Sequence, residues 1–170
     1  MDAEIVILRL LHIVPGVIWV GSAVFLAFVL QPALAKTGPP HSGALMTNMV
    51  KPLSILLHST AWLTMVVGVI MAFRVRDPLF DFLWSTNWGT MIWLGFLFAV
   101  VGYAIGTSGS LSSMKVLNIG RSLAGQPPSA EQAADIGALQ KRAMLLTKIA
   151  ALPVVAAVVT MALANTSRQV

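Results

Sequence analysis

Residues 5–34 read IVILRLLHIVPGVIWVGSAVFLAFVLQPAL, an apolar run interrupted by Arg9, His12, Pro15 and Gln31. A helix that crosses the hydrocarbon core of a bilayer needs about 20 predominantly apolar residues. Because no water is available there, a spanning segment must hydrogen-bond its own backbone, which makes it helical. The run is also far longer than the ~7–15-residue core of a cleavable signal peptide. We therefore expect it to be a retained transmembrane helix.

Three further apolar runs follow, at residues 52–73, 88–106 and 149–164. Only 10% of the 170 residues are charged and 57% are hydrophobic, whereas soluble domains carry about 25% charged residues. The chain contains no cysteine, which excludes a disulfide scaffold and any cysteine-ligated zinc or iron–sulfur centre. The sequence thus predicts one all-α integral membrane domain over residues 1–170, built as a polytopic four-helix bundle.

The connections between these spans differ in character. Loop 1, residues 36–51, contains Gly38-Pro39-Pro40, which predicts that the helix is interrupted there. Loop 2, residues 74–87, carries the aromatic side chains typical of a membrane interface. Loop 3 keeps a helical spacing of apolar residues beyond Gly106, and Ser129 with Gln132 forms a capping-box pattern. We expect the third and fourth helices to continue past the membrane as a paired hairpin over residues 107–148.

The basic residues indicate orientation. In a four-span chain the N-terminus, loop 2 and the C-terminus share one side, here called end A, and loops 1 and 3 share the other, end B. The net charge of +5 sits at the ends of the apolar runs, so it reports topology and not nucleic-acid binding. End B carries seven basic residues and end A four, which predicts a bacterial inner-membrane protein with both termini outside and loops 1 and 3 in the cytoplasm. The seven are Lys36, Lys51, Lys115, Arg121, Lys141, Arg142 and Lys148; the four are Arg9, Arg74, Arg76 and Arg168.

Two ionisable residues, His12 and His58, lie within the predicted spans. Such residues are costly in a membrane and are candidates for function. Each could be a neutral imidazole hydrogen-bonded to a neighbouring helix, or an axial haem ligand or other metal ligand. At 1.5 Å per residue the two differ in depth by about 14 Å, so they are not expected to bind one haem together.

The surroundings of His12 suit a haem whose propionates point toward end A. Arg9 lies one turn nearer that end, and Arg74 and Arg76 emerge at the same surface, where guanidinium groups can pair with carboxylates. Gly16 and Trp19 continue the helical stripe of His12, giving space and a flat wall. A methionine at this depth is a possible second ligand, since Met/His ligation occurs in cytochromes. The candidates are Met71, Met91 and Met161.

Leu11-His12 followed by Trp19 and Gly21 has the pattern L-H-x6-W-x-G. It resembles the first helix of the copper-resistance-D-like integral membrane domains and the related HemJ-type protoporphyrinogen oxidases, and the similarity extends over about residues 8–106. The resemblance implies a four-helix membrane bundle that binds b-type haem through His12. In the HemJ-type enzymes a lysine near the start of the third span partners that histidine. Here Ile92 occupies the lysine position, so oxidase activity is disfavoured, and the adjacent Met91 is the preferred second ligand.

The resulting hypothesis is a haem b protein of the membrane that transfers electrons, as a small subunit or redox partner of a larger complex or as a homo-oligomer. A second hypothesis is copper handling, because thioether and imidazole ligands suit Cu(I). His41, Met46 and Met49 in loop 1 are its candidate ligands. A third is a structural subunit without a cofactor, in which the hairpin over residues 107–148 docks a partner. No acidic residue lies within a span, so a carboxylate proton relay is not expected.

Overall fold

The computed structural model describes residues 3–37, 39–75, 79–123 and 125–166, with side chains at all of these except 39–42, 44, 82, 165 and 166. Every element in this part of the chain is helical. Four helical stretches are long and apolar enough to cross a membrane, namely Ala3–Thr37, Leu45–Val75, Asn87–Ser122 and Ala130–Ala164. The predicted all-α membrane bundle with four spans is therefore confirmed.

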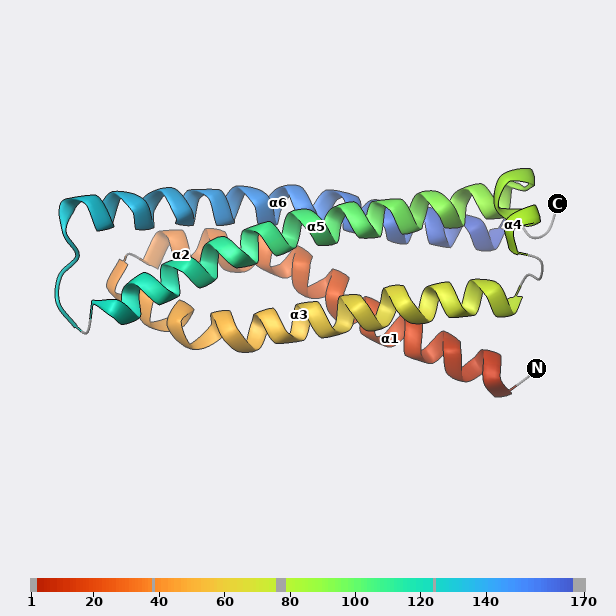
Figure 1. The fold of residues 1–170 in the computed structure, drawn as a ribbon, viewed down its shortest axis with the longest axis horizontal. Helices are drawn as coiled ribbons and strands as arrows, with labels where there is room; N and C mark the ends of the chain where they lie inside the picture. The colour runs from red at the N-terminus through yellow and green to blue at the C-terminus, as the bar shows by residue number, and fades with distance from the viewer. Residues whose placement is uncertain (1–2, 38, 76–78, 124, 167–170) are drawn as a thin grey trace.

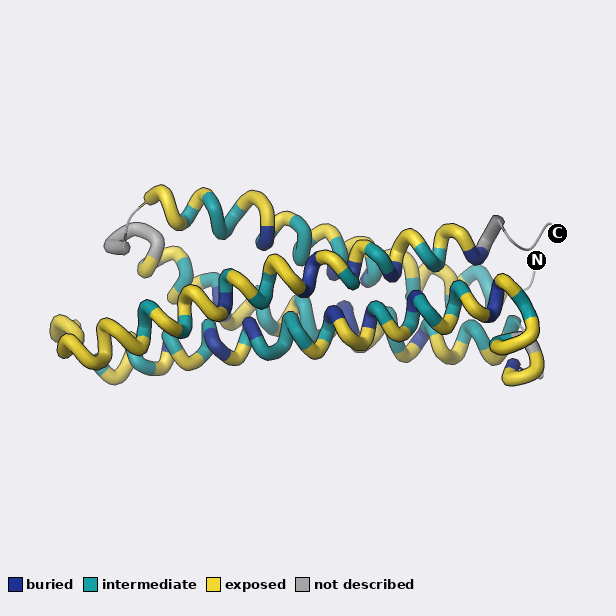
Figure 2. The backbone as a smooth tube through the Cα atoms, turned by 90° about the horizontal axis from the view of Figure 1, so that it is seen from above, coloured by how far each residue is buried: buried dark blue, intermediate teal, exposed yellow. Residues whose placement is uncertain are grey.

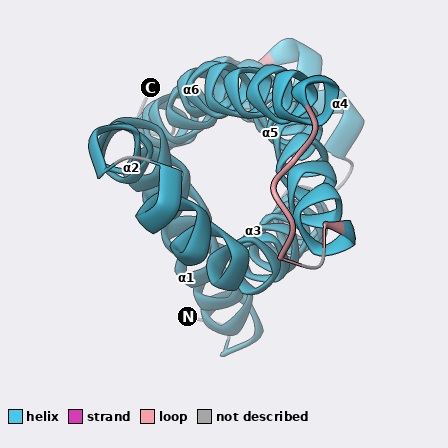
Figure 3. Cartoon of the chain, turned by 90° about the vertical axis from the view of Figure 1, so that its left-hand side faces the viewer, coloured by secondary structure: helices cyan, strands magenta, loops and turns pink. Residues whose placement is uncertain are grey.

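The first span is a continuous rod made of α1 (Ala3–Phe25), the π-helical turn η1 (Leu26–Leu30) and α2 (Gln31–Thr37). The other elements are α3 (Pro39–Val75), the short α4 (Leu79–Ser85), α5 (Asn87–Ser122) and α6 (Ala130–Thr166). Seen end-on, the rods form a ring in the order α1–α3–α5–α6, with α2 beside α6 (Figure 3). The start of α1, α4 and the end of α6 lie at the same end of the bundle, which is end A (Figure 1).

Small residues let α5 and α6 pack closely. A Cβ added to Gly102 would lie 2.5 Å from Val154 Cγ2 and 3.2 Å from the backbone nitrogen of the same residue. Gly95 and Gly109 meet α6 in the same way. In lipid, where apolar side chains gain little by leaving the solvent, such close backbone approach is what holds helices together. The glycines of the third span therefore serve helix packing.

Apolar side chains face outward over most of the bundle. Buried positions are few, and exposed and intermediate positions alternate along the rods (Figure 2). Val17 and Leu152 are 67% and 65% exposed. An apolar outer surface of this extent is suited to a lipid environment, and it leaves only the interior for polar chemistry.

Loop 1 differs from its prediction. Of the predicted break at Gly38-Pro39-Pro40, Pro39 and Pro40 are helical, because α3 begins at Pro39 and runs through Pro52, whereas Gly38 lies outside the described residues. Proline fits the first turn of a helix, where its missing N–H would have no partner within the helix. The expected loop over residues 36–51 is therefore mostly helix. Loop 2 contains an additional short helix, α4, which begins at Leu79.

The helical hairpin at end B is present. Ser129 and Gln132 form the predicted capping box, with the Gln132 N–H donating to Ser129 Oγ at 3.2 Å and the Ser129 N–H donating to Gln132 Oε1 at 3.0 Å. The turn between α5 and α6 extends beyond the turn between α2 and α3 (Figure 1). Ser110 nevertheless hydrogen-bonds Ser54 of α3, so the first turns of the 107–148 segment lie beside the second span and not beyond it.

Candidate functional site

His12 lies in the contact between α1 and α3. Its Nδ1 is 2.8 Å from the backbone oxygen of Thr64. A carbonyl oxygen can only accept, so Nδ1 carries the proton and donates, and in the neutral ring Nε2 keeps its lone pair. Nε2 has no hydrogen-bond partner among the described residues. The hydrogen bond expected of a packing histidine is therefore present, and it uses only one of the two ring nitrogens.

Gly68 lets the imidazole of His12 lie against α3. A Cβ at this glycine would be 2.7 Å from His12 Cε1 and 2.9 Å from Nδ1, closer than real Cβ contacts. Gly16, one turn along α1, faces the Thr64 side chain, and its own added Cβ would be 3.4 Å from Thr64 Cγ2. The ring is thus clamped between a backbone acceptor and a glycine, with its orientation fixed.

The structure separates some of the residues grouped with His12 in the sequence. Arg9 is exposed on α1, and Arg74 is exposed at end A, where its Nε is 3.2 Å from Glu4 Oε1. Met91 belongs to a different cluster, packed with Leu79, Trp88 and Ala164 at the junction of α4, α5 and α6. The first turns of α1 diverge from α5 and α6 (Figure 1), and Figure 3 shows the same separation of the start of α1 from α4. The contacts of His12 described above, with Thr64 and Gly68, are both with α3 and do not involve Met91. Arg76 lies outside the described residues.

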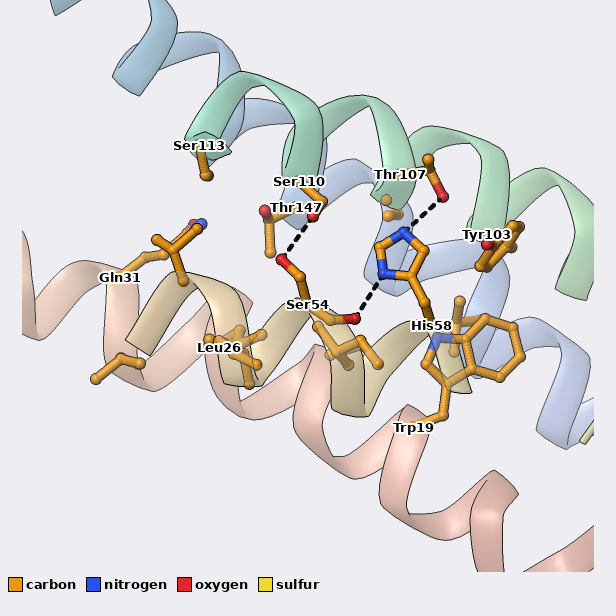
Figure 4. A pocket seen from close by; sticks show the side chains of 18 of the residues that line it. Trp19, Leu26, Gln31, Ser54, His58, Tyr103, Thr107, Ser110, Ser113 and Thr147 are labelled. Atoms are coloured by element: carbon orange, nitrogen blue, oxygen red, sulfur yellow. Dashed lines mark hydrogen bonds between the residues drawn. The ribbon is translucent and has the colours of Figure 1, made fainter. Parts of the chain in front are cut away.

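His58 occupies the interior of the bundle. Its Nδ1 is 2.7 Å from the Ser54 backbone oxygen, so this nitrogen also donates, and Nε2 faces the Thr107 hydroxyl at 3.4 Å (Figure 4). The ring stands edge-on to Tyr103, with the centroids 5.5 Å apart. A hydrogen bond of 3.4 Å is long, so Nε2 of His58 is only weakly satisfied by the protein.

Tyr103 is the centre of an aromatic cluster that the sequence did not point to. Trp19 of α1 and Trp62 of α3 both stand edge-on to its ring, at centroid distances of 6.4 and 6.0 Å. The Trp62 Nε1–H donates to the Tyr103 hydroxyl at 2.9 Å. Trp19, proposed as a wall for a group at His12, is buried in the central core and instead borders His58. A single tyrosine gave no periodic signal by which sequence reasoning could have found this cluster.

A cavity of about 120 Å³ runs along the bundle axis from His58 toward end B. On α3 its lining extends from Met46 to His58 and on α5 from Gly102 to Ser113, which at 1.5 Å per residue corresponds to roughly 16–18 Å. Figure 4 shows Thr107, Ser110 and Ser113 in succession along one side of it. Ser54 and Ser110 hydrogen-bond each other across it at 2.9 Å, and Thr147 adds a hydroxyl from α6. The cavity is lined mainly by apolar side chains, with polar groups contributed by α2, α3, α5 and α6.

Gln31 lies at the end-B part of this cavity (Figure 4). Its Oε1 is buried and has no hydrogen-bond partner in the described part of the chain. It follows the π-helical turn η1, whose Leu26 carbonyl accepts from the Gln31 N–H. Pro32 comes next and has no N–H for the carbonyl four residues back, which explains why the regular ladder is interrupted here. Turns of this kind often occur at functional sites.

The two histidines are separate sites. His12 contacts α3 between Thr64 and Gly68, six to ten residues from His58, or roughly 9–15 Å at the helical rise. This range includes the offset of about 14 Å expected from the sequence. One iron atom would need both imidazoles within about 4 Å of each other, since each His–metal bond is ~2 Å long.

Two of the three ligands suggested for copper have described side chains. Met46 lines the cavity, Met49 is partly buried on α3 nearby, and the His41 side chain lies outside the described residues. In the described part of the chain no three of His, Cys, Asp and Glu come together as a metal-binding group.

Comparisons with protein-family models, with curated proteins and with solved structures find no match to this chain.

Proposed function

We propose that this multi-pass chain is a haem b-binding membrane protein that transfers electrons, with His12 as an axial ligand. The observation that carries the proposal is the hydrogen bond from His12 Nδ1 to the Thr64 carbonyl. Metal-ligating histidines commonly donate their other ring N–H to a carbonyl, which fixes the tautomer and the ring orientation and makes the ligating nitrogen more basic. The lone pair of Nε2 is left for iron.

The residues around His12 fit haem in their donor chemistry. The Thr64 carbonyl orients the ring, and Gly68 makes room for it against α3. Arg9 is exposed one turn nearer end A and has no ion pair among the described residues, so its guanidinium is available to a propionate. Arg74 serves the same surface but already pairs with Glu4. The divergence of α1 from α5 and α6 keeps this part of α1 from being closed into the bundle core (Figure 1).

His58 is less suited to haem. Its Nε2 faces the Thr107 hydroxyl, and the adjoining cavity of about 120 Å³ is smaller than the ~300–1,000 Å³ of pockets that hold drug-sized ligands. A porphyrin would require the helices to separate there. His12 lines neither of the two main cavities among the described residues, so a porphyrin at His12 would have to lie on the side of α1 that diverges from α5 and α6 (Figure 1). We therefore assign the haem to His12 and leave His58 to a different role.

Bound haem would supply one-electron transfer between ferric and ferrous iron. The chain's own residues bind and orient it: Thr64 holds the imidazole, Gly68 admits it, and Arg9 offers charge to a propionate. The proposal places the protein in a bacterial inner membrane, with end A outside and end B in the cytoplasm. Its electron partner would be another subunit of a membrane complex or a second copy.

An absorption spectrum of the protein purified from a haem-replete host tests the proposal. We expect a Soret band and reduced haemochrome bands that are lost in His12→Ala and kept in the matched variant His58→Ala. Colourless wild-type protein would refute the assignment, and so would an unchanged spectrum in His12→Ala. Elemental analysis of the same sample separates the other hypotheses: stoichiometric copper without haem favours copper handling, and neither metal favours a structural subunit.

A further inference from the structure

The cavity beside His58 contains polar groups that have no role in the assignment of haem to His12. Its lining includes the buried and unpartnered Oε1 of Gln31 and hydroxyl groups from three helices. Apolar cavities in proteins stay empty, whereas polar ones large enough for a water molecule are filled. An empty cavity would leave the Gln31 oxygen without any hydrogen bond, which is strongly unfavourable for a buried acceptor.

The size and shape of the cavity match a narrow file of water. A volume of about 120 Å³ is several times the ~10–15 Å³ that one water molecule needs, so the cavity has room for several water molecules. These would be distributed along the roughly 16–18 Å of lining helix. Thr107, Ser110 and Ser113 recur every three residues on α5, so their hydroxyl groups line one side of the file at intervals of about 4.5 Å (Figure 4).

The position of the cavity connects the interior to end B. Buried Trp19 and Val154 close its inner part, at 6% and 2% exposure. Gln31 and Met46 line the opposite part. Lys51, which is exposed on α3, lies seven residues before His58, or about 10 Å along the helix. If this lysine marks the headgroup level, the file needs to cross only about a third of a ~30 Å hydrocarbon core to reach His58.

We propose that this cavity holds a file of water that links the aqueous phase at end B with Nε2 of His58. The inner end of the file is Nε2 of His58, which is 3.4 Å from the Thr107 hydroxyl and only weakly hydrogen-bonded by the protein. Near the entrance, the side-chain carbonyl of Gln31 accepts a hydrogen bond from the water file. The path gives an intramembrane imidazole contact with the aqueous phase. It does not depend on haem binding at His12.

Single-cysteine variants test the path directly, because the native chain contains no cysteine. Thr107→Cys and Ser110→Cys place a thiol in the cavity. Ile149→Cys and Leu145→Cys are matched controls on the outer face of α6, where the native side chains are 40% and 58% exposed. Positions 107 and 149 lie at the same level along the bundle because Gly106 packs on Ala150, and positions 110 and 145 do so because Gly109 packs on Leu146. The probe is Ag⁺, which is small enough for a file of water, added at end B to the full chain in liposomes.

We expect Ag⁺ to protect the cavity thiols from later alkylation about tenfold faster than the outer-face thiol at position 149. A charge in the middle of a bilayer would give a ratio of about a hundred. The ratio expected here is smaller because these positions lie only about 10 Å inside the level of Lys51. Adding Gln31→Leu to Thr107→Cys should slow the reaction about tenfold, the factor expected from one lost hydrogen bond to the file. Ser110→Cys provides an independent reading if Thr107→Cys does not fold.

Three results would overturn the proposal. If the cavity thiols react with Ag⁺ no faster than the outer-face thiols, the cavity contains no water. Equal and rapid reaction at all four positions means that this level of the bundle lies outside the hydrocarbon. An unchanged rate after Gln31→Leu means that water does not pass the Gln31 carbonyl. Each result is independent of the haem spectrum, so failure here and failure of the haem assignment are distinguishable.

Discussion

Replacing Gly68 with alanine tests the clamp on His12. The new Cβ would lie 2.7 Å from His12 Cε1, so the imidazole must move, although its Nδ1 is held by the Thr64 carbonyl at 2.8 Å. Overpacking of this kind costs about 1–3 kcal/mol. The strained or lost hydrogen bond adds about 0.5–1.5 kcal/mol. Alanine returns about 1 kcal/mol through its better helix propensity. The expected net loss of stability is about 0.5–3.5 kcal/mol.

The assay is unfolding of the detergent-solubilised protein, with nitrogen-15 NMR of the histidine side chains as a second reading. Gly21→Ala is the matched control, because Gly21 is also in the first half of the bundle and a Cβ there meets nothing within 4 Å. We expect Gly21→Ala to leave stability unchanged or raise it slightly, and Gly68→Ala to lower it and shift the His12 Nδ1–H signal. Equal stability of the two variants, with an unshifted His12 signal, would show that the imidazole is not clamped as described.

Three other predictions concern the scaffold. Gly102→Ala should lower stability by about 1–3 kcal/mol or more. The new Cβ would lie 3.2 Å from the Val154 backbone nitrogen, and a backbone atom cannot rotate away as a side chain can. Unfolding measurements test this against the control Gly120→Ala, where nothing lies within 4 Å of the new Cβ. Ser129→Ala should remove the hydrogen bond from the Gln132 N–H to Ser129 Oγ and destabilise the start of α6 by about 1 kcal/mol. Amide hydrogen exchange should become faster in the first turn of α6 and remain unchanged in α3. Reporter fusions in a bacterial host should place the end of α6 outside and the α5–α6 turn in the cytoplasm; the reverse pattern would contradict the orientation derived from the basic residues.

Much of the fold follows from local sequence properties. The length and apolarity of residues 5–34 predict a spanning helix without reference to any other part of the chain, and the same holds for the other three spans. The Ser129–Gln132 capping box was predictable because both partners lie within one turn. The break predicted at Gly38-Pro39-Pro40 was too long because proline is equally compatible with a loop and with a first helical turn, and only the chain after it decides between them.

The candidate site was predictable only in part. Both histidines were identifiable, because an ionisable residue in an apolar run is a local observation. Their acceptors were not: the partner of His12 is a backbone oxygen 52 positions away. The placement of Met91 with α4 and α6, the central position of Tyr103 and the unpartnered oxygen of Gln31 likewise depend on how each helix is rotated about its axis.

The sequence alone determined that this protein has four membrane-spanning helices, where most of them end, and which imidazoles lie between those ends. Only the tertiary structure decided which helices are neighbours, that His12 packs on Gly68 while His58 faces a polar cavity, and that Trp19 belongs to the second of these sites. The physical reason is that lipid is as apolar as leucine, so hydropathy does not distinguish the protein-facing side of a spanning helix from its lipid-facing side. Close contacts at small residues and hydrogen bonds between helices make that choice, and both involve residues far apart in the chain.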